Sequence, residues 1–279
     1  MSKPDLQALL PHVEDIARLA GAEIMKFYDG TDVIIKDDGS EVTAADHAAE
    51  NVILPALAAL TPHIPIVSEE RFAAGDAPDV SGGTFWTVDP LDGTKEFINK
   101  TGAFVVAIAL VVDNKAAMGI IYHPAKGVLY SAAGIGTATK TGPDGIRHSI
   151  GKHAKQQGNL HVLVNEPHAD MPRIKGWLGA QFKKAADIDP KSGIFRPCQI
   201  AEGLADMAVF CSAKRQGRIK WWDVAPGHAI LEAAGGTAET LEGGPLLYDA
   251  ADYQVGPHAF KSAGMSKKPP PPAPPAVAL

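Results

Sequence analysis

The first thirty residues carry apolar side chains at steps of three and four, the spacing that brings them onto one face of an α-helix. The repeat begins at Leu6, reaches Phe27 and stops at Asp29-Gly30, which predicts one long amphipathic helix. Thr43, a side chain suited to cap a helix N-terminus, predicts a second helix that runs to about Leu60. Further helices are expected near Pro172–Leu178 and over about Ala225–Ala234.

Short apolar runs between these helices predict strands. The longest, AFVVAIALVV from Ala103 to Val112, is too short for the ~18 residues that a membrane span needs, so it is interpreted as a buried strand. Residues 73–83 predict an exposed loop, and residues 134–151 are rich in turn-forming residues. Strands are expected at Val33–Ile35, Ile64–Val67, Phe85–Val88, Phe104–Val112, Ala117–Tyr122, Val128–Ala132 and Leu160–Val164.

This alternation of strands and helices predicts an α/β protein of two lobes. Residues 1–150 would form the first lobe and residues 151–265 the second, with the turn-rich stretch at their junction. Residues 266–279 are rich in proline, and because such a composition cannot pack a core, a disordered tail is expected. A tail of this kind could also recruit an SH3-like partner, so a scaffold role stays open beside an enzymatic one.

Composition narrows the class of protein. The 279 residues are 46% hydrophobic and 21% charged, as in ordinary soluble proteins. The formal net charge of −6 argues against wrapping a nucleic-acid polymer, which normally needs a basic excess. No apolar run is long enough to span a membrane. The N-terminus carries acidic residues within its apolar stretch, unlike a signal peptide. Cys198 and Cys211 form no CxxC pair, which suits a reducing cytoplasm.

Acidic residues gather where predicted strands meet turns. Carboxylates at the ends of apolar strands can come together without entering the core, and hard cations such as Mg²⁺ prefer oxygen ligands. If all six candidates converge, they equal the whole formal net charge of −6, and they could not all stay ionised without compensating cations. The six are Asp46, Glu69, Glu70, Asp89, Asp92 and Asp223.

The segment Asp89-Pro-Leu-Asp-Gly-Thr94 combines metal-binding and anion-binding features. Pro90 fixes its own φ and keeps Asp89 out of helical geometry. The resulting turn can aim both aspartates and the Leu91 carbonyl at one point. Gly93 and Thr94 follow at what looks like a helix start, where backbone N–H groups suit phosphate oxygens.

This segment, with Ser68-Glu69-Glu70 before it and Trp222-Asp223 after it, resembles the magnesium-dependent, lithium-sensitive phosphatases of the inositol monophosphatase superfamily. The extended string Asp89–Ile98, with Val42-Thr-Ala-Ala-Asp46, is similar to the bacterial 3′(2′),5′-bisphosphate nucleotidase branch. The resemblance runs from about Ala8 to Pro257. It implies a layered α/β/α/β/α sandwich of the inositol monophosphatase/fructose-1,6-bisphosphatase type.

The resemblance also implies roles for individual residues. Two or three Mg²⁺ ions are expected, with Li⁺ inhibitory, and the ions would activate water for in-line attack on phosphorus. The implied metal ligands are Glu69, Asp89, the Leu91 carbonyl, Asp92 and Asp223. The implied catalytic residues are Asp46 and Thr94, which would orient and deprotonate the water, with Glu70 in support. The implied substrate contacts are Gly93, Thr94, Arg196, Arg215 and Lys36.

The expected reaction is removal of the 3′-phosphate from adenosine 3′,5′-bisphosphate, which recycles a by-product of sulfate activation in the cytoplasm. The expected partner is thus a small phosphorylated metabolite, with room for a homodimer. Asn165-Glu166-Pro167-His168 and Ser192-Gly193-Ile194 depart from the nucleotidase pattern, so inositol monophosphate or another sugar phosphate stays open as the substrate. A module that senses a phosphorylated metabolite without hydrolysing it is a further alternative.

Several of these residues also have plain structural interpretations. Thr43 and Asp46 could form only a helix-capping pair, and Asp223 could only cap the helix that follows it. Trp221 and Trp222 are expected to pack in the core rather than to stack on a base. The cations between Lys214 and Lys220 could be partly solvated surface.

Overall fold

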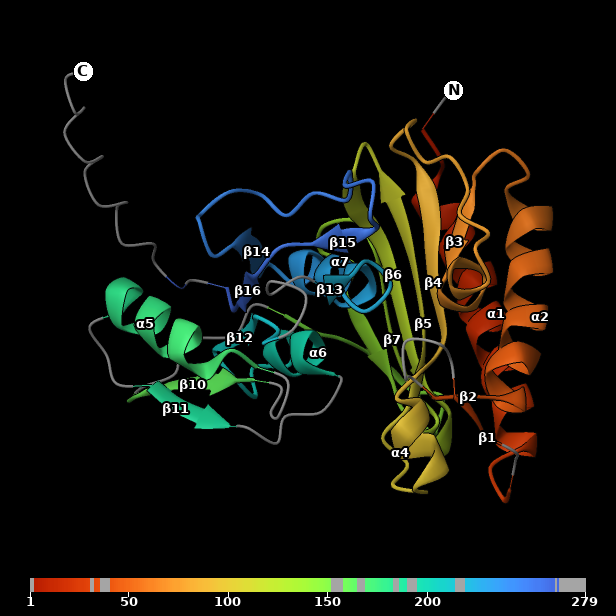
Figure 1. The fold of residues 1–279 in the computed structure, drawn as a ribbon, viewed down its shortest axis with the longest axis horizontal. Coiled ribbons are helices and arrows are strands. Elements are labelled where there is room, and N and C mark those ends of the chain that lie inside the picture. The colour runs from red at the N-terminus through yellow and green to blue at the C-terminus, as the bar shows by residue number, and fades with distance from the viewer. Residues whose placement is uncertain are drawn as a thin grey trace.

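The computed structural model is a stack of five alternating layers of helix and sheet (Figure 1). It describes residues 3–30, 33–35, 41–151, 158–164, 169–182, 186–189, 195–213, 219–263 and 265. The proline-rich tail expected over residues 266–279 lies outside these ranges. Among the described residues, no helix is long and apolar enough to cross a bilayer.

The first layer contains the two helices that the apolar periodicity predicts. Helix α1 spans Leu6–Lys26 and helix α2 spans Ala44–Leu60, with Thr43 as the predicted N-cap. Their apolar faces, including Val13, Ile24, Ile53 and Leu57, are buried against the first sheet. The remaining helices are α3 (Glu69–Ala73), α4 (Thr94–Ile98), a 3₁₀ turn η1 (Pro124–Lys126), α5 (Met171–Gln181), α6 (Arg196–Ala201) and α7 (Ala225–Ala233).

The second layer is a seven-stranded sheet in the order β3-β4-β5-β6-β7-β8-β9. Strands β3 and β4 are parallel, and every other neighbouring pair is antiparallel. A separate pair, β1 (Val33–Ile35) and β2 (Glu41–Thr43), precedes α2. The strands of the large sheet are β3 (Ile66–Ser68), β4 (Phe85–Asp92), β5 (Val105–Val112), β6 (Lys115–His123), β7 (Val128–Ala133), β8 (Thr139–Thr141) and β9 (Arg147–Ser149).

Strand β5 shows why its sequence is a continuous apolar run. Val106, Ile108 and Leu110 pack toward α1 and α2. Ala107 and Ala109, which alternate with them, pack on the opposite face against α6, α7 and the second sheet. Because both faces are covered, no position along the strand favours a polar side chain.

The third, fourth and fifth layers complete the stack. Helices α6 and α7 form the third layer, between the two sheets. The second sheet has the order β11-β10-β12-β16-β14, and α5 covers its outer face through Ile174 and Leu178. The observed layers confirm the α/β/α/β/α arrangement. The strands of the second sheet are β10 (Leu160–Leu163), β11 (Ala186–Asp189), β12 (Met207–Phe210), β14 (Thr237–Thr240) and β16 (His258–Lys261). A separate two-stranded sheet pairs β13 (Ile219–Lys220) with β15 (Gln254–Val255).

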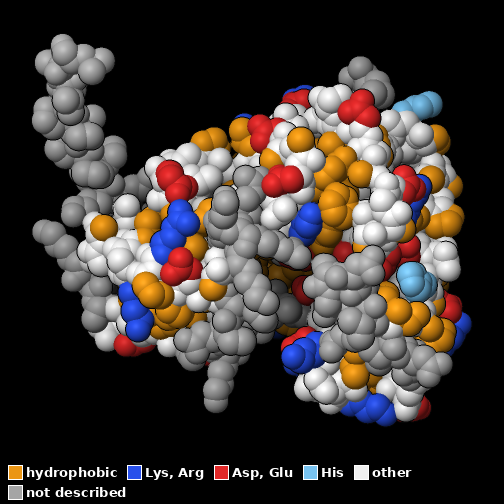
Figure 2. Space-filling view, viewed as in Figure 1, with side chains coloured by type: hydrophobic (Ala, Val, Ile, Leu, Met, Phe, Trp, Pro, Cys, Tyr) orange, Lys and Arg blue, Asp and Glu red, His pale blue; other side chains and the backbone are white. Residues whose placement is uncertain are grey.

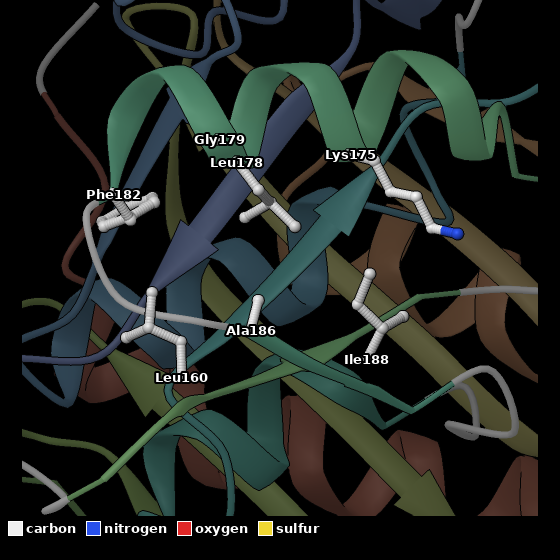
Figure 3. Close-up of a pocket in the computed structure, with 7 residues that line it drawn as sticks. All are labelled: Leu160, Lys175, Leu178, Gly179, Phe182, Ala186 and Ile188. Atoms are coloured by element: carbon white, nitrogen blue, oxygen red, sulfur yellow. The ribbon is translucent and has the colours of Figure 1, made fainter.

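A cavity of about 350 Å³ lies between α5 and the edge of the second sheet. Figure 3 shows that aliphatic and aromatic side chains line it, with Lys175 at one end. None of the predicted site residues lines this cavity.

The surface charge is mixed. Figure 2 shows acidic and basic side chains interspersed over one face of the molecule, where the described residues form no large patch of only positive or only negative charge.

The sequence-based element boundaries need several corrections. The turn-rich stretch 134–151 contains the short strands β8 and β9, whose residues are mostly polar or exposed. Residues 200–210, which the sequence left unassigned, contain the end of α6 and strand β12. Strand β4 continues past the predicted end at Val88 to Asp92, because a bulge accommodates Pro90.

The contact between β6 and α7 predicts a strong effect of adding one methyl group. A Cβ at Gly119 would collide with the Pro226 carbonyl oxygen and lie 3.0 Å from the Ala229 Cβ. Gly119→Ala should lower the free energy of unfolding by about 2 kcal/mol or more, because two packed layers must separate. Gly179→Ala is the matched control, since Gly179 lies in α5 with open space around it. The control should stabilise by roughly 0.5–1 kcal/mol. Urea unfolding of both variants measures the difference, and equal effects would contradict this account of the β6–α7 contact.

Candidate functional site

The acidic residues lie at one edge of the seven-stranded sheet, beginning with the parallel pair β3 and β4. Ser68, the last residue of β3, pairs with Val88 of β4. Glu69 therefore follows β3 where Asp89 follows Val88, since parallel strands end at the same edge of a sheet. Helix α3 begins at Glu69, and its next residue, Glu70, is buried.

A β-bulge brings the two aspartates of β4 to the same face. Residues three apart on a regular strand point to opposite faces. Here Asp89 pairs with Ala107 and Asp92 pairs with Val105, so β4 holds one more residue than β5 between these pairs. Ala107 and Val105 both face α6 and α7. Both aspartates consequently face the third layer.

Asp223 is brought to this face by the buried pair of tryptophans before it. The Trp221 ring stacks on Phe85 of β4 with centroids 5.0 Å apart, and Trp222 lies 5.5 Å from Phe72 of α3. Both tryptophans are buried, so the packing interpretation of the pair is confirmed. The chain then places Asp223 just before α7, whose N-cap is Val224.

Asp46 reaches the site from the first turn of α2. Its Oδ2 accepts hydrogen bonds from the Thr43 N–H (2.8 Å) and the Thr43 hydroxyl (2.7 Å), which confirms the capping interpretation. The Thr94 hydroxyl lies 3.2 Å from both Asp46 Oδ1 and the Leu91 carbonyl oxygen. It has one proton to donate to these two acceptors. The capping pair therefore also joins α2 to the Asp89–Thr94 turn.

The pKa shifts show that these carboxylates affect one another. Burial raises the pKa of Asp89 well above its ordinary value, and the charges of Glu69, Asp92, Asp223 and Asp46 raise it further. Burial and the charge of Glu69 raise the pKa of Asp92 to about 7, although Arg196 opposes the shift. The structure thus brings four of the other five acidic candidates within electrostatic range of Asp89.

The described carboxylates of this cluster are not arranged as a complete set of metal ligands. In the described ranges, no three carboxylate, imidazole or thiol groups are arranged so that they could hold a metal ion. Protein groups occupy part of their bonding capacity: the Leu91 N–H donates to Asp89 Oδ1 at 3.0 Å, and Thr43 bonds Asp46. The donor chemistry nevertheless fits a hard divalent cation, because every candidate ligand atom is an oxygen and the acids of the cluster repel one another.

Arg196 supplies a buried positive charge beside this cluster. Its guanidinium lies over the Phe210 ring, 4.1 Å from the centroid. Burial lowers its pKa to about 10, while Asp92 and Asp223 favour the charged form. Its Nε and Nη1 have no hydrogen-bond partner among the residues that the structure describes. A buried cation with unused N–H donors is suited to receive the oxygens of an anionic group.

Gly93 has a conformational reason to be glycine. It adopts φ 94°, in the left-handed region, and precedes α4. A Cβ there would lie 2.8 Å from the Ala103 carbonyl oxygen. Of the other predicted substrate contacts, Lys36 and Arg215 lie outside the described residues, as do Asn165–His168 and Ser192–Ile194.

Glu50 was missed by the sequence analysis. It lies four residues after Asp46 and hence on the same face of α2. The Ser68 hydroxyl donates a hydrogen bond to its carboxylate, which ties α2 to the residue before Glu69. The i, i+4 spacing from Asp46 is the signal that could have identified it.

Comparison with known proteins gives consistent results. The model of the family described as the inositol monophosphatase family matches residues 5–267. The 3′(2′),5′-bisphosphate nucleotidase CysQ of Escherichia coli K12 is 38% identical over 252 residues, covering 89% of this chain and 97% of that protein. The corresponding protein of Buchnera aphidicola is 35% identical over 243 residues, with 86% and 87% covered.

Solved structures agree with the fold. The crystal structure of CysQ from Bacteroides thetaiotaomicron, described as a bacterial member of the inositol monophosphatase family, superposes with a TM-score of 0.72 at 29% identity. It covers 89% of this chain and 94% of its own. The inositol monophosphatase from Anabaena has the same fold, with a TM-score of 0.69 at 24% identity and 93% and 92% coverage.

The raised pKa of Asp92 predicts a specific pH dependence of stability in EDTA. An acid whose folded-state pKa lies above its unfolded value stabilises the fold below the unfolded pKa, and this stabilisation is lost as pH rises through the folded pKa. The free energy of unfolding should therefore fall between about pH 4 and pH 7, with Asp92 contributing on the order of 4 kcal/mol. Asp92→Asn should flatten this part of the profile.

Urea unfolding at a series of pH values measures the effect. Asp113→Asn is the control, because Asp113 is an exposed residue that pairs with Lys3 and is not one of the predicted site residues. A profile of Asp92→Asn as steep as that of the control would show that Asp92 is not the destabilised acid.

Proposed function

The chain belongs to the inositol monophosphatase family, and we propose that it is a metal-dependent phosphatase that removes the 3′-phosphate from adenosine 3′,5′-bisphosphate. Water is consumed, and the products are adenosine 5′-monophosphate and inorganic phosphate. The observation that carries the proposal is the gathering of mutually repelling carboxylates at the end of β3 and β4, beside a buried arginine with unused donors. The nucleotidases named CysQ from Escherichia coli K12 and Buchnera aphidicola share 38% and 35% identity with the chain over most of its length.

We propose Mg²⁺ as the cofactor, held by Glu69, Asp89, the Leu91 carbonyl, Asp92 and Asp223. The repulsion that raises the pKa values of Asp89 and Asp92 supports this assignment, because a divalent cation would convert it into attraction. When bound, Mg²⁺ supplies Lewis-acid stabilisation of the phosphoryl oxygens and lowers the pKa of water. Two or three ions and inhibition by Li⁺ belong to the same proposal.

Asp46 and Thr94 are proposed to orient the attacking water and accept its proton. The Thr94 hydroxyl bridges Asp46 Oδ1 and the Leu91 carbonyl, so it connects the capping pair of α2 to a proposed ligand. Burial raises the pKa of Asp46, while hydrogen bonds from Thr43 and Thr94 favour its ionised form. An ionised but partly desolvated carboxylate is suited to accept a proton. Glu70, buried in the first turn of α3, would support this arrangement.

Arg196 is proposed to bind phosphate oxygens of the substrate. Its charge interacts with those of Asp92 and Asp223, so it supplies a cation beside acids that would otherwise repel an anion. The unused Nε–H and Nη1–H donors match the acceptor oxygens of a phosphate. Gly93, Thr94, Lys36 and Arg215 are proposed as further substrate contacts.

The wider biological setting is also part of the proposal. The enzyme would act in the cytoplasm and recycle the bisphosphate by-product of sulfate activation. Its first lobe would span residues 1–150 and its second residues 151–265, and a homodimer is compatible with this arrangement.

Asp89→Asn tests the metal assignment. Loss of one charge from the proposed ligand set should lower phosphate release by at least about 100-fold at saturating Mg²⁺. Asp113→Asn is the matched control, since Asp113 is an exposed residue at positive φ (51°), a conformation that asparagine tolerates. Assays of wild type with EDTA in place of Mg²⁺ should lose activity to the same degree. Retained turnover in Asp89→Asn would refute the ligand role.

Arg196→Met tests the anion contact. Methionine retains much of the apolar packing on Phe210 but removes the charge, so KM for adenosine 3′,5′-bisphosphate should rise about tenfold or more. Arg196→Lys should show a smaller rise, and Arg173→Met, a change at an exposed residue, should show none. Steady-state kinetics with the bisphosphate and with inositol monophosphate also compares the two substrates by kcat/KM. An unchanged KM in Arg196→Met would refute the contact, and a higher kcat/KM for inositol monophosphate would refute the proposed substrate.

A further inference from the structure

His123 lies two strands from Asp92 on the same face of the seven-stranded sheet. Asp92 pairs with Val105 of β5, and Val106 pairs with Tyr122 of β6. Continuing the antiparallel register by one residue puts His123 opposite Val105. Residues opposite each other share a face, so Asp92, Val105 and His123 form a row across three strands. Neighbouring strands are about 4.8 Å apart, which separates His123 from Asp92 by roughly 10 Å.

The imidazole of His123 is buried, and the described part of the chain offers it no hydrogen-bond partner. The residue is 2% exposed, and neither Nδ1 nor Nε2 is hydrogen-bonded to any described residue. Leaving a buried polar atom unsatisfied lowers the stability of the fold. A purely apolar side chain would fill the position without this cost, so the histidine calls for a functional explanation.

Its surroundings keep this histidine neutral. Burial lowers the pKa of His123 to about 4, and the nearby charge of Lys126 contributes in the same direction. A neutral imidazole offers one N–H donor and one nitrogen acceptor. This pair complements a hydroxyl group, which also donates once and accepts, better than it complements a phosphate, which would favour a cation.

The residue that covers the imidazole connects it to the proposed phosphate contact. The Phe195 ring is parallel to the imidazole at 3°, with centroids 4.9 Å apart. Phe195 is only partly buried, so His123 lies one side chain below the surface. The next residue, Arg196, lies within electrostatic range of Asp92 and Asp223. The start of α6 therefore spans the distance between the acidic cluster and His123.

From this geometry we infer that His123 is a specificity-determining residue, which hydrogen-bonds a hydroxyl group on the part of the substrate that carries the scissile phosphate. The inference rests on the proposed phosphatase function, but it does not depend on which polyol ester is the substrate. Ribose and inositol esters both carry hydroxyl groups near the phosphate. The roughly 10 Å between Asp92 and His123 suits a phosphate at one end of a sugar-sized group and a hydroxyl at the other.

His123→Phe tests the inference, because phenylalanine retains the stacking on Phe195 and removes both nitrogens. KM should rise about tenfold for adenosine 3′,5′-bisphosphate, and kcat should change less than twofold. Kinetics with 4-nitrophenyl phosphate, which carries no hydroxyl, should be unchanged. The melting temperature should not fall, since two unsatisfied polar atoms are removed. Tyr122→Phe is the control, because it removes a hydroxyl from the adjacent residue, which packs toward the opposite face of the sheet. It should leave the kinetics with both substrates and the melting temperature unchanged.

The outcomes separate this inference from the proposed substrate. If wild type prefers inositol monophosphate, the bisphosphate proposal fails, and the effect of His123→Phe is then measured on inositol monophosphate with the same expected rise in KM. Equal changes on the hydroxyl-bearing ester and on 4-nitrophenyl phosphate would overturn the inference and show a structural role. An unchanged KM for the preferred ester would also overturn it. His123→Asn, which retains a donor and an acceptor, should lose less than His123→Phe if both fold, and it replaces His123→Phe in the same assays if that variant does not.

Discussion

Mutual repulsion within one cluster of carboxylates, of which Asp46 and Asp89 are buried, is the constraint around which this structure is arranged. Asp89 is buried and senses the charges of four other acids. Such a group favours the neutral form, and it opposes folding wherever it is forced to ionise. The fold must therefore hold these residues together against their own electrostatics, which demands a rigid support and nearby groups that favour negative charge.

The support comes from elements that are covered on both sides. Strand β5 is buried between the first and third layers, and its register with β4 imposes the bulge that turns Asp92 toward Asp89. The start of α2 supplies Asp46, and the segment before α7 supplies Asp223. Partial compensation comes from Arg196, whose charge lowers the pKa of Asp92, and from the Leu91 N–H that bonds Asp89. These contributions are short-range, and the pKa values of Asp89 and Asp92 stay raised in spite of them.

Much of this arrangement could be predicted from the sequence, because many of its features depend only on residues that are close together along the chain. The cap at Thr43, the doubly buried run of β5 and the Asp-Pro-Leu-Asp-Gly turn each follow from neighbouring residues. The parts that could not be predicted depend on register or on distant contacts. The pairing of Asp92 with Val105 needs the bulge, which no local pattern specifies. The contact of the Arg196 guanidinium with the Phe210 ring joins a helix to a strand fourteen positions further along the chain. Strands such as β13 and β15, with two residues each, are too short to give a periodic signal.

The acids differ in how the fold treats them, and this difference separates their chemistry. Asp46 accepts two hydrogen bonds from Thr43 and lies within reach of the Thr94 hydroxyl, and these contacts oppose the larger effect of its burial, which raises its pKa. Asp89 accepts one backbone hydrogen bond and faces four like charges. Hydrogen bonds stabilise a carboxylate without adding charge, so those that Asp46 accepts favour its ionised form. Asp89 has less of this compensation, and the charge of Glu69 raises the pKa values of both Asp89 and Asp92. A single acidic cluster thereby contains carboxylates that are compensated to different degrees, because the first turn of α2 and the bulge of β4 contribute different numbers of hydrogen-bond donors.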